Sequence, residues 1–306
     1  MNSPNQHDGA TLRPTASFDP THLKLAILLI CAGVALLVVN DAGAKLLTDR
    51  YPPVQILVLR NLIAIPIIVG IIAAFVGVSA LRTHQPGLHA LRGILMVAAV
   101  WLNFTGLSYL PLAEATALIF SAPLFITALS VPLLREKVGW RRWSAVLVGF
   151  IGVLVIVRPG GATFQLASLL PVTAALMYAL FMISARWIGR GESFWTMMLF
   201  VMLFPMLYAA PIALAVWTPI LPGDFWLFVG IAICGSLGLA LIGQAFRLAP
   251  AAIVAPFDYT ALIWAAGLGW MLWGDKPVIW TLIGAIIIAI SGVFLMVREA
   301  STPSGK

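Results

Sequence analysis

The chain consists almost entirely of long apolar stretches separated by short polar breaks. The stretches recur at about 20 residues each, the length that an α-helix needs to cross the roughly 30 Å hydrocarbon core of a membrane. Segments of about ten residues that alternate apolar and polar side chains, as in membrane barrels, are missing. The pattern therefore predicts an all-α integral membrane protein with ten transmembrane helices, at residues 24–47, 54–76, 88–109, 112–134, 141–158, 166–187, 194–216, 225–246, 250–273 and 277–297.

The composition agrees with a chain that lies in a lipid bilayer. Of the 306 residues, 61% are hydrophobic and 9% are charged, whereas soluble domains carry roughly 25% charged residues. The polar ends, 1–23 and 300–306, are expected to form tails, the first disordered and without the apolar core of a signal peptide. Cys31 and Cys234 fall inside spans and far from any CxxC spacing, so neither a metal site nor a cofactor is expected.

The net charge of +7 is distributed as a topology signal. With ten spans, basic residues gather on the side that holds both chain ends, and cytoplasmic loops carry such an excess. Both ends are therefore predicted to be cytoplasmic, in a multi-pass protein of the cell inner membrane that has no nucleic-acid partner. The predicted inner side holds Arg13, Lys24, Arg82, Arg92, Arg135, Lys137, Arg141, Arg142, Arg186, Arg190, Arg247, Arg298 and Lys306, and the outer side Lys45, Arg50, Arg158 and Lys276.

The second half of the chain repeats the first at a shift of about 139 to 140 residues. Pro111 then matches Pro250, and Arg158 matches Arg298 after a one-residue slip. The repeat divides the chain into residues 24–159 and 160–299, with five spans each. Because five is odd, the second copy crosses the membrane in the opposite sense. Such inverted repeats are typical of secondary transporters with a central site that opens alternately to each side.

Three stretches carry a family resemblance: "LPLAEATAL" (110–118), "LREKVGWRRWSAVLVGFIGVLVIVRPG" (134–160) and "APFDYTALIWA" (255–265). Together with ten spans in two inverted halves, they resemble the EamA-type branch of the drug/metabolite transporter superfamily. The resemblance implies transport of a small organic metabolite through a cavity between the halves. It is greatest to bacterial members assigned to uptake of heterocyclic metabolites such as riboflavin or S-adenosylmethionine; export of amino acids or drugs is the alternative on the same fold.

Charged side chains inside spans are the candidates for a substrate site. An ionised group at the bilayer centre costs about 2.5–3.5 kcal/mol, so it normally faces a partner or a wet cavity. Asp258 lies eight residues into the ninth span, and we expect it to contact substrate, to accept a proton, or to hold helices together. Tyr259 and Trp264 either line the same cavity or pack in the core.

Arg60, Asp41 and Asn40 form a second set of candidates near Asp258. Arg60 either forms an ion pair with Asp41 or Glu114 or binds an anionic substrate group. Asp41 and Lys45 share a helix face at i, i+4 and are expected to form a salt bridge. Asn40 is equally suited to form a hydrogen bond with a substrate or with a neighbouring helix.

Further polar and aromatic candidates lie toward the predicted outer side. Glu114 follows Pro111, where a carboxylate stabilises a helix N-terminus or stands at the mouth of the cavity. Asn103 offers a polar group at a depth in the membrane near that of Glu114. Phe120 either stacks on a flat ligand or packs in the core.

Two other classes of membrane protein remain as alternatives. A membrane-embedded lipid-modifying enzyme needs clustered catalytic groups, but the four histidines fall in the tail or at the second loop and its edge. A channel favours an oligomeric pore. The sequence thus favours a carrier, not an enzyme, with a small-molecule substrate, no ATP site and a possible homodimer through glycine-rich spans such as 141–158 and 277–297.

Overall fold

The computed structural model describes residues 20–135, 138–159, 165–188, 192–249 and 251–301 as a bundle of helices without strands in these ranges. Nearly all of the two predicted tails lies outside the described residues. The helices are α1 (Pro20–Thr48), α2 (Pro53–Ile71), α3 (Pro86–Leu107), α4 (Leu112–Ile119), α5 (Ala122–Leu134), α6 (Trp140–Val157), α7 (Leu169–Ile188), α8 (Phe194–Ala215), α9 (Phe225–Leu248), α10 (Ala251–Val254), α11 (Ala261–Trp273) and α12 (Ile279–Ser301), with short π or 3₁₀ turns at Ile72–Val76, Val78–Leu81, Leu166–Ser168 and Ala255–Thr260.

Eight helical segments of the described chain are long and apolar enough to cross a membrane, and a shorter apolar helix covers Ile279–Leu295. They confirm the expected all-α membrane protein. The eight are His22–Thr48, Pro53–Val76, Pro86–Leu107, Leu112–Leu134, Trp140–Val157, Leu166–Ala185, Phe194–Ala215 and Phe225–Leu248. The ninth expected span, 250–273, is not one continuous α-helix.

Two of the expected spans are interrupted near their middle. Span 112–134 changes from α4 to α5 at Phe120 and Ser121, and span 250–273 passes through the 3₁₀ turn Ala255–Thr260. Pro123 stands in the first turn of α5 and Pro256 in the first turn of the 3₁₀ segment, where a missing N–H costs no helical hydrogen bond.

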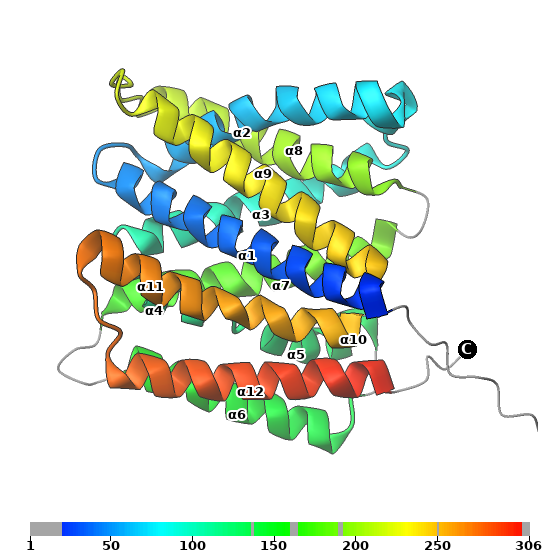
Figure 1. Ribbon diagram of the computed structural model, residues 1–306, viewed down its shortest axis with the longest axis vertical. Coiled ribbons are helices and arrows are strands. Elements are labelled where there is room, and N and C mark those ends of the chain that lie inside the picture. The colour runs from blue at the N-terminus through cyan, green and yellow to red at the C-terminus, as the bar shows by residue number, and fades with distance from the viewer. Residues whose placement is uncertain (1–19, 136–137, 160–164, 189–191, 250, 302–306) are drawn as a thin grey trace, which may run out of the picture.

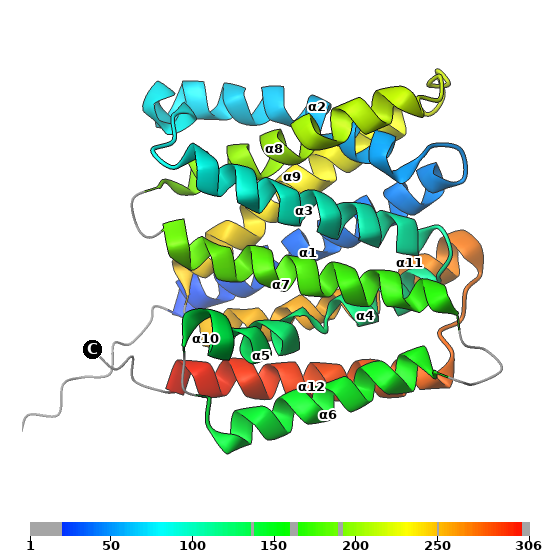
Figure 2. The same cartoon turned by 180° about the vertical axis from the view of Figure 1, so that it is seen from behind.

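The helices form two layers that lie back to back. In Figure 1, α9, α1, α10–α11 and α12 lie in order from top to bottom on the near side. From behind, α3, α7, α4–α5 and α6 occupy the corresponding places (Figure 2). The layers join where α1 packs on α3, α11 on α4, and α12 on α6, while α2 and α8 pack together at one edge.

Both ends of the described chain lie at one end of the bundle. The first residues of α1 and the last of α12 both lie at the right of Figure 1. This agrees with an even number of membrane crossings. We refer to this end as the chain-terminus end and to the other, which holds the loop between α1 and α2, as the opposite end.

Small residues set the closest helix contacts. A side chain added at Gly33 of α1 would come within 2.8 Å of the Gly238 carbonyl oxygen on α9, and one at Gly238 would meet the Gly33 carbonyl at the same distance. On α6 and α12, Gly152 and Gly284 face each other's carbonyls in the same way. Close backbone approach of this kind drives helix association in membranes, where no hydrophobic effect acts between helices.

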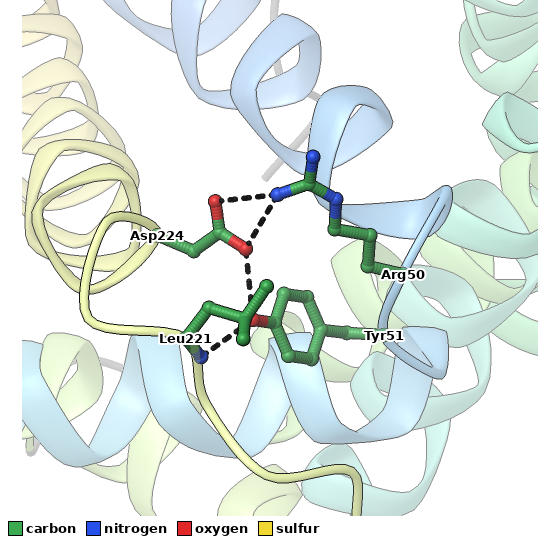
Figure 3. A network of polar contacts seen from close by, with 4 residues as sticks. All are labelled: Arg50, Tyr51, Leu221 and Asp224. Atoms are coloured by element: carbon green, nitrogen blue, oxygen red, sulfur yellow. Dashed lines mark hydrogen bonds and ion pairs between the residues drawn. The ribbon is translucent and has the colours of Figure 1, made fainter.

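Polar clasps join loops at both ends of the α2–α8 pair. At the opposite end, Asp224 forms an ion pair with Arg50 at 3.1 Å and accepts a hydrogen bond from the Tyr51 hydroxyl at 2.8 Å, while the Leu221 amide donates to that hydroxyl at 3.0 Å (Figure 3). At the chain-terminus end, Glu192 accepts from the Thr83 hydroxyl at 2.6 Å and from the His84 amide at 2.8 Å. The loops are therefore fixed by directed bonds.

The α1–α9 crossing predicts opposite effects for two glycines of the same helix. Gly238→Ala places a methyl group against the Gly33 backbone and is expected to destabilise the protein by about 1–3 kcal/mol. Gly230→Ala meets nothing within 4 Å and should be neutral or slightly stabilising, because alanine favours a helix. Thermal unfolding of both purified variants in detergent tests this; equal melting temperatures would contradict the crossing.

The clasp at Asp224 predicts a pH effect on stability. The hydrogen bond from Tyr51 and the charge of Arg50 hold the pKa of the Asp224 carboxyl below its ordinary value of 3.8. A lowered pKa in the folded state stabilises the protein above pH 3.8, and this contribution is lost as the pH falls through the folded-state pKa. Between about pH 6 and about pH 3, wild-type protein should therefore lose more melting temperature than Asp224→Asn. An identical loss in both proteins would show that the clasp does not contribute.

Candidate functional site

Asn40, Asp41 and Arg60 lie close together, as expected, where α1 faces α2. The Asn40 side-chain amide donates to Asp41 Oδ1 at 3.0 Å. Arg60 lies within electrostatic reach of Asp41, but the two side chains make no contact within 4.0 Å. The Arg60 guanidinium lies 5.5 Å from the Phe104 ring centroid and makes only long hydrogen bonds, of 3.3 and 3.4 Å, to Asn61 Oδ1.

Lys45 does not pair with Asp41, so the expected i, i+4 salt bridge is wrong. The lysine ammonium donates to the carbonyl oxygens of Leu107, at 2.9 Å, and of Leu110. It also lies 5.3 Å from the Trp273 ring centroid. Carbonyls at a helix C-terminus lack partners and carry partial negative charge, so Lys45 instead caps the end of α3.

Asp258, Tyr259 and Phe120 form a second group, which brings together the two interrupted spans. The rings of Phe120 and Tyr259 lie 4.9 Å apart at an interplanar angle of 34°. Asp258 interacts electrostatically with Tyr259 and with Tyr178 of α7. The Tyr259 hydroxyl is buried and has no hydrogen-bond partner among the described residues. It lies against Gly292 of α12, where a side chain would collide with it.

The two groups stand apart along the bundle. Among the described residues, no hydrogen bond, ion pair or ring contact joins Asp41 or Arg60 to Asp258. Asp41 and Arg60 lie about 10 Å from the ends of α1 and α2 at the opposite end, counting 1.5 Å per residue. Asp258 lies in the half of its span nearer the chain-terminus end. A solute that crossed the bundle from one end to the other would therefore pass the two polar groups one after the other.

Both groups face other helices while staying partly accessible. Asp41, Arg60 and Asp258 are packed deep in the bundle, yet none is fully buried. Tyr178, midway along α7, is 36% exposed despite an equally deep position.

The remaining predicted residues lie elsewhere. Glu114, in the first turn of α4, accepts a hydrogen bond from the Ser168 hydroxyl at 3.3 Å, close to the loop that precedes α7. Asn103 is partly accessible on α3, next to the buried Phe104. Trp264 is 47% exposed and shares the outward arc of α11 with Ile263, Trp270 and Met271. It therefore lies away from the Asp258 group.

Sequence reasoning missed three polar residues inside the bundle. Arg92 and His89, expected at the inner loop or its edge, are buried in α3. The Arg92 guanidinium lies 4.2 Å from the Phe181 ring centroid and makes 3.4 Å bonds to Phe181 O and Ser184 Oγ. The sequence signal that could have identified Arg92 is a charged residue near the start of an apolar span. Tyr178 carries no such signal, because an aromatic in an apolar run resembles any core residue.

Comparison with known proteins identifies the family. The sequence profile of the EamA-like transporter family matches residues 24–158 and again residues 165–298. The chain belongs to this transporter family. A riboflavin transporter of Vibrio cholerae is 33% identical over 89% of this chain and 93% of its own length. An S-adenosylmethionine uptake transporter of Rickettsia prowazekii is 29% identical over 88% of this chain and 91% of its own.

A crystal structure supports the fold alone. It covers 90% of this chain and 99% of its own, with a TM-score of 0.60 and 22% sequence identity. As a transporter of the EamA-like family, the protein is a multi-pass membrane protein that carries small molecules. The relatives are named as transporters rather than as enzymes.

Proposed function

We propose that the protein is a secondary transporter that moves a small heterocyclic metabolite, such as riboflavin or S-adenosylmethionine, across the bacterial inner membrane by alternating access. The names of relatives that match most of the chain support this substrate class. The basic residues that the sequence assigns to the chain-terminus end support cytoplasmic termini. Transport draws on a gradient of substrate, protons or an exchanged solute.

We further propose ten membrane crossings in two inverted halves, because the packing repeats itself. The pairs α1–α9 and α3–α7 correspond under the sequence shift, and α2–α8, α4–α11 and α6–α12 each pair a helix with its own counterpart. Phe120 and Tyr259, whose rings meet, are 139 positions apart. The bonds from Ser121 to Leu118 O and from Thr260 to Phe257 O, each 2.7 Å, repeat at the same shift.

One observation carries the proposal most directly. Rotating the molecule by 180° brings α3 and α7 to the places that α9 and α1 held before (Figures 1 and 2). The two matches to the family profile fall on the halves that this rotation exchanges. A central site between such halves can open to one side by the same motion, mirrored, that opens it to the other.

Asp258 is the proposed coupling residue and central polar contact, with Asp41 and Arg60 as a separate charged pair along the path. Among the described residues no basic side chain pairs with Asp258, so its carboxylate is free to take up a proton or a substrate group. It stands in the 3₁₀ turn of an interrupted span, where freed backbone carbonyls line a cavity more readily than lipid. The two interruptions are the proposed hinges.

The test is transport in proteoliposomes. Wild-type protein should give saturable uptake that is stimulated by unlabelled substrate inside the vesicles and driven to accumulation by a proton gradient. Asp258→Asn should abolish the proton-driven accumulation and leave exchange intact, because exchange needs binding without net proton movement.

A matched control is Asp49→Asn, which removes an exposed acid near the end of α1 and should change neither readout. Undiminished accumulation by Asp258→Asn would refute the coupling role. Chemical conversion of the solute would indicate an enzyme, and unsaturable electrical flux would indicate a channel.

A further inference from the structure

The Asp41–Arg60 pair has bonding capacity that the protein leaves unused. A guanidinium has five N–H donors and a carboxylate about four acceptor positions. Arg60 donates two long hydrogen bonds to the Oδ1 atom of its neighbour Asn61, at 3.3 and 3.4 Å. Within the described part of the chain, Asp41 accepts a single hydrogen bond, from Asn40. Buried polar groups are otherwise nearly always satisfied.

The two opposite charges are near but held apart. An acid and an arginine alone in a low-dielectric interior gain most by closing into a bidentate contact. Here neighbours fix each of them. The Phe104 ring lies 5.5 Å from the Arg60 guanidinium, and the Asn40 amide holds the Asp41 carboxylate. Asn40 itself fits against α9 because Gly235 has no side chain, since a Cβ there would approach Asn40 Oδ1 to 2.9 Å.

The open pair sets a chemical requirement for its ligand. A lone anion would satisfy Arg60 but would be repelled by Asp41, and a lone cation would meet the reverse problem. An uncharged group would leave both charges without an ionic partner. A group with a carboxylate and an ammonium a few ångströms apart satisfies both at once and adds no net charge to the interior.

We propose that Arg60 and Asp41 bind the amino-acid head group of a zwitterionic substrate, with Arg60 holding its carboxylate and Asp41 its ammonium. Asn40 is a positioning residue that orients the Asp41 carboxylate. This inference rests on the proposed function and selects, among heterocyclic metabolites, those that carry an α-amino-acid moiety. The rings of Phe120 and Tyr259 are the aromatic pair available along the same path.

The experiment compares three ligands on purified protein. S-adenosylmethionine carries the complete head group, its decarboxylated form lacks only the carboxylate, and riboflavin lacks both charges. Wild-type protein should bind S-adenosylmethionine at least about tenfold more tightly than the decarboxylated form, the expected size of a lost charged hydrogen bond. Arg60→Gln should remove this difference and bind both about equally.

Two further variants separate recognition from folding. Arg60→Lys keeps the charge and should restore part of the preference for the carboxylate. Arg92→Gln removes another buried arginine, which contacts Phe181 and Ser184 instead, and should change the affinity for both adenosyl ligands by the same factor. A melting temperature accompanies each affinity.

Equal wild-type affinities for the two adenosyl ligands would overturn the inference, since the pair would then be satisfied by water alone. Saturable transport of riboflavin without binding of S-adenosylmethionine would also overturn it while leaving the proposed carrier intact. Absence of transport for every heterocycle, with the head-group preference present, would instead count against the proposed function.

Discussion

The cost of a charge in hydrocarbon is the constraint on which the arrangement of this protein depends. Asp41, Arg60 and Asp258 lie well inside their spans, and the short side chains of the two acids cannot reach water at the membrane surface. Each instead faces a neighbouring helix: Arg60 lies near the Phe104 ring of α3, and Asp258 lies within electrostatic reach of Tyr178 on α7. The same constraint places Lys45 on the free carbonyls at the end of α3.

The backbone obeys an equivalent constraint where two spans are interrupted. Hydrocarbon offers no hydrogen bonds, so an irregular segment must be satisfied by the protein or by cavity water. At the two interruptions, the hydroxyls of Ser121 and Thr260 donate hydrogen bonds to the carbonyl oxygens three residues earlier in the chain. The interruptions bring Phe120 against Tyr259. The irregular backbone and the group of Asp258, Tyr259 and Phe120 therefore occupy the same part of the bundle.

Rigid contacts surround this part. Gly33 and Gly238 bring α1 and α9 into backbone contact, and the clasps of Asp224 and Glu192 fix loops at both ends of α2 and α8. We propose that movement is concentrated in the interrupted spans, where the α-helical hydrogen bonds are not continuous. Such a division between fixed scaffold and jointed helices suits a carrier that must change shape around a bound solute.

The sequence predicted the helical segments well, because bilayer thickness dictates their length. It singled out Asp258 and the group of Asn40, Asp41 and Arg60 as candidates, because charges in apolar runs are conspicuous. It failed where tertiary contacts decide. The Lys45 ammonium donates to carbonyl oxygens more than 60 positions away in the chain. The spacing of residues along one helix cannot predict such a contact. Counting loops assigned Arg92 to the membrane surface, whereas it packs on Phe181. Tyr178 was indistinguishable from a core aromatic.

The central claim is that the intramembrane charges border an internal, water-reachable space. The most direct measurement is thiol modification by a charged, membrane-impermeant reagent of Asp258→Cys and Ile263→Cys, in protein whose Cys31 and Cys234 have been replaced. Position 258 should react from at least one side of the membrane, and position 263, which is 73% exposed on the outward arc of α11, should react from neither. Reaction at 263 with none at 258 would contradict the account.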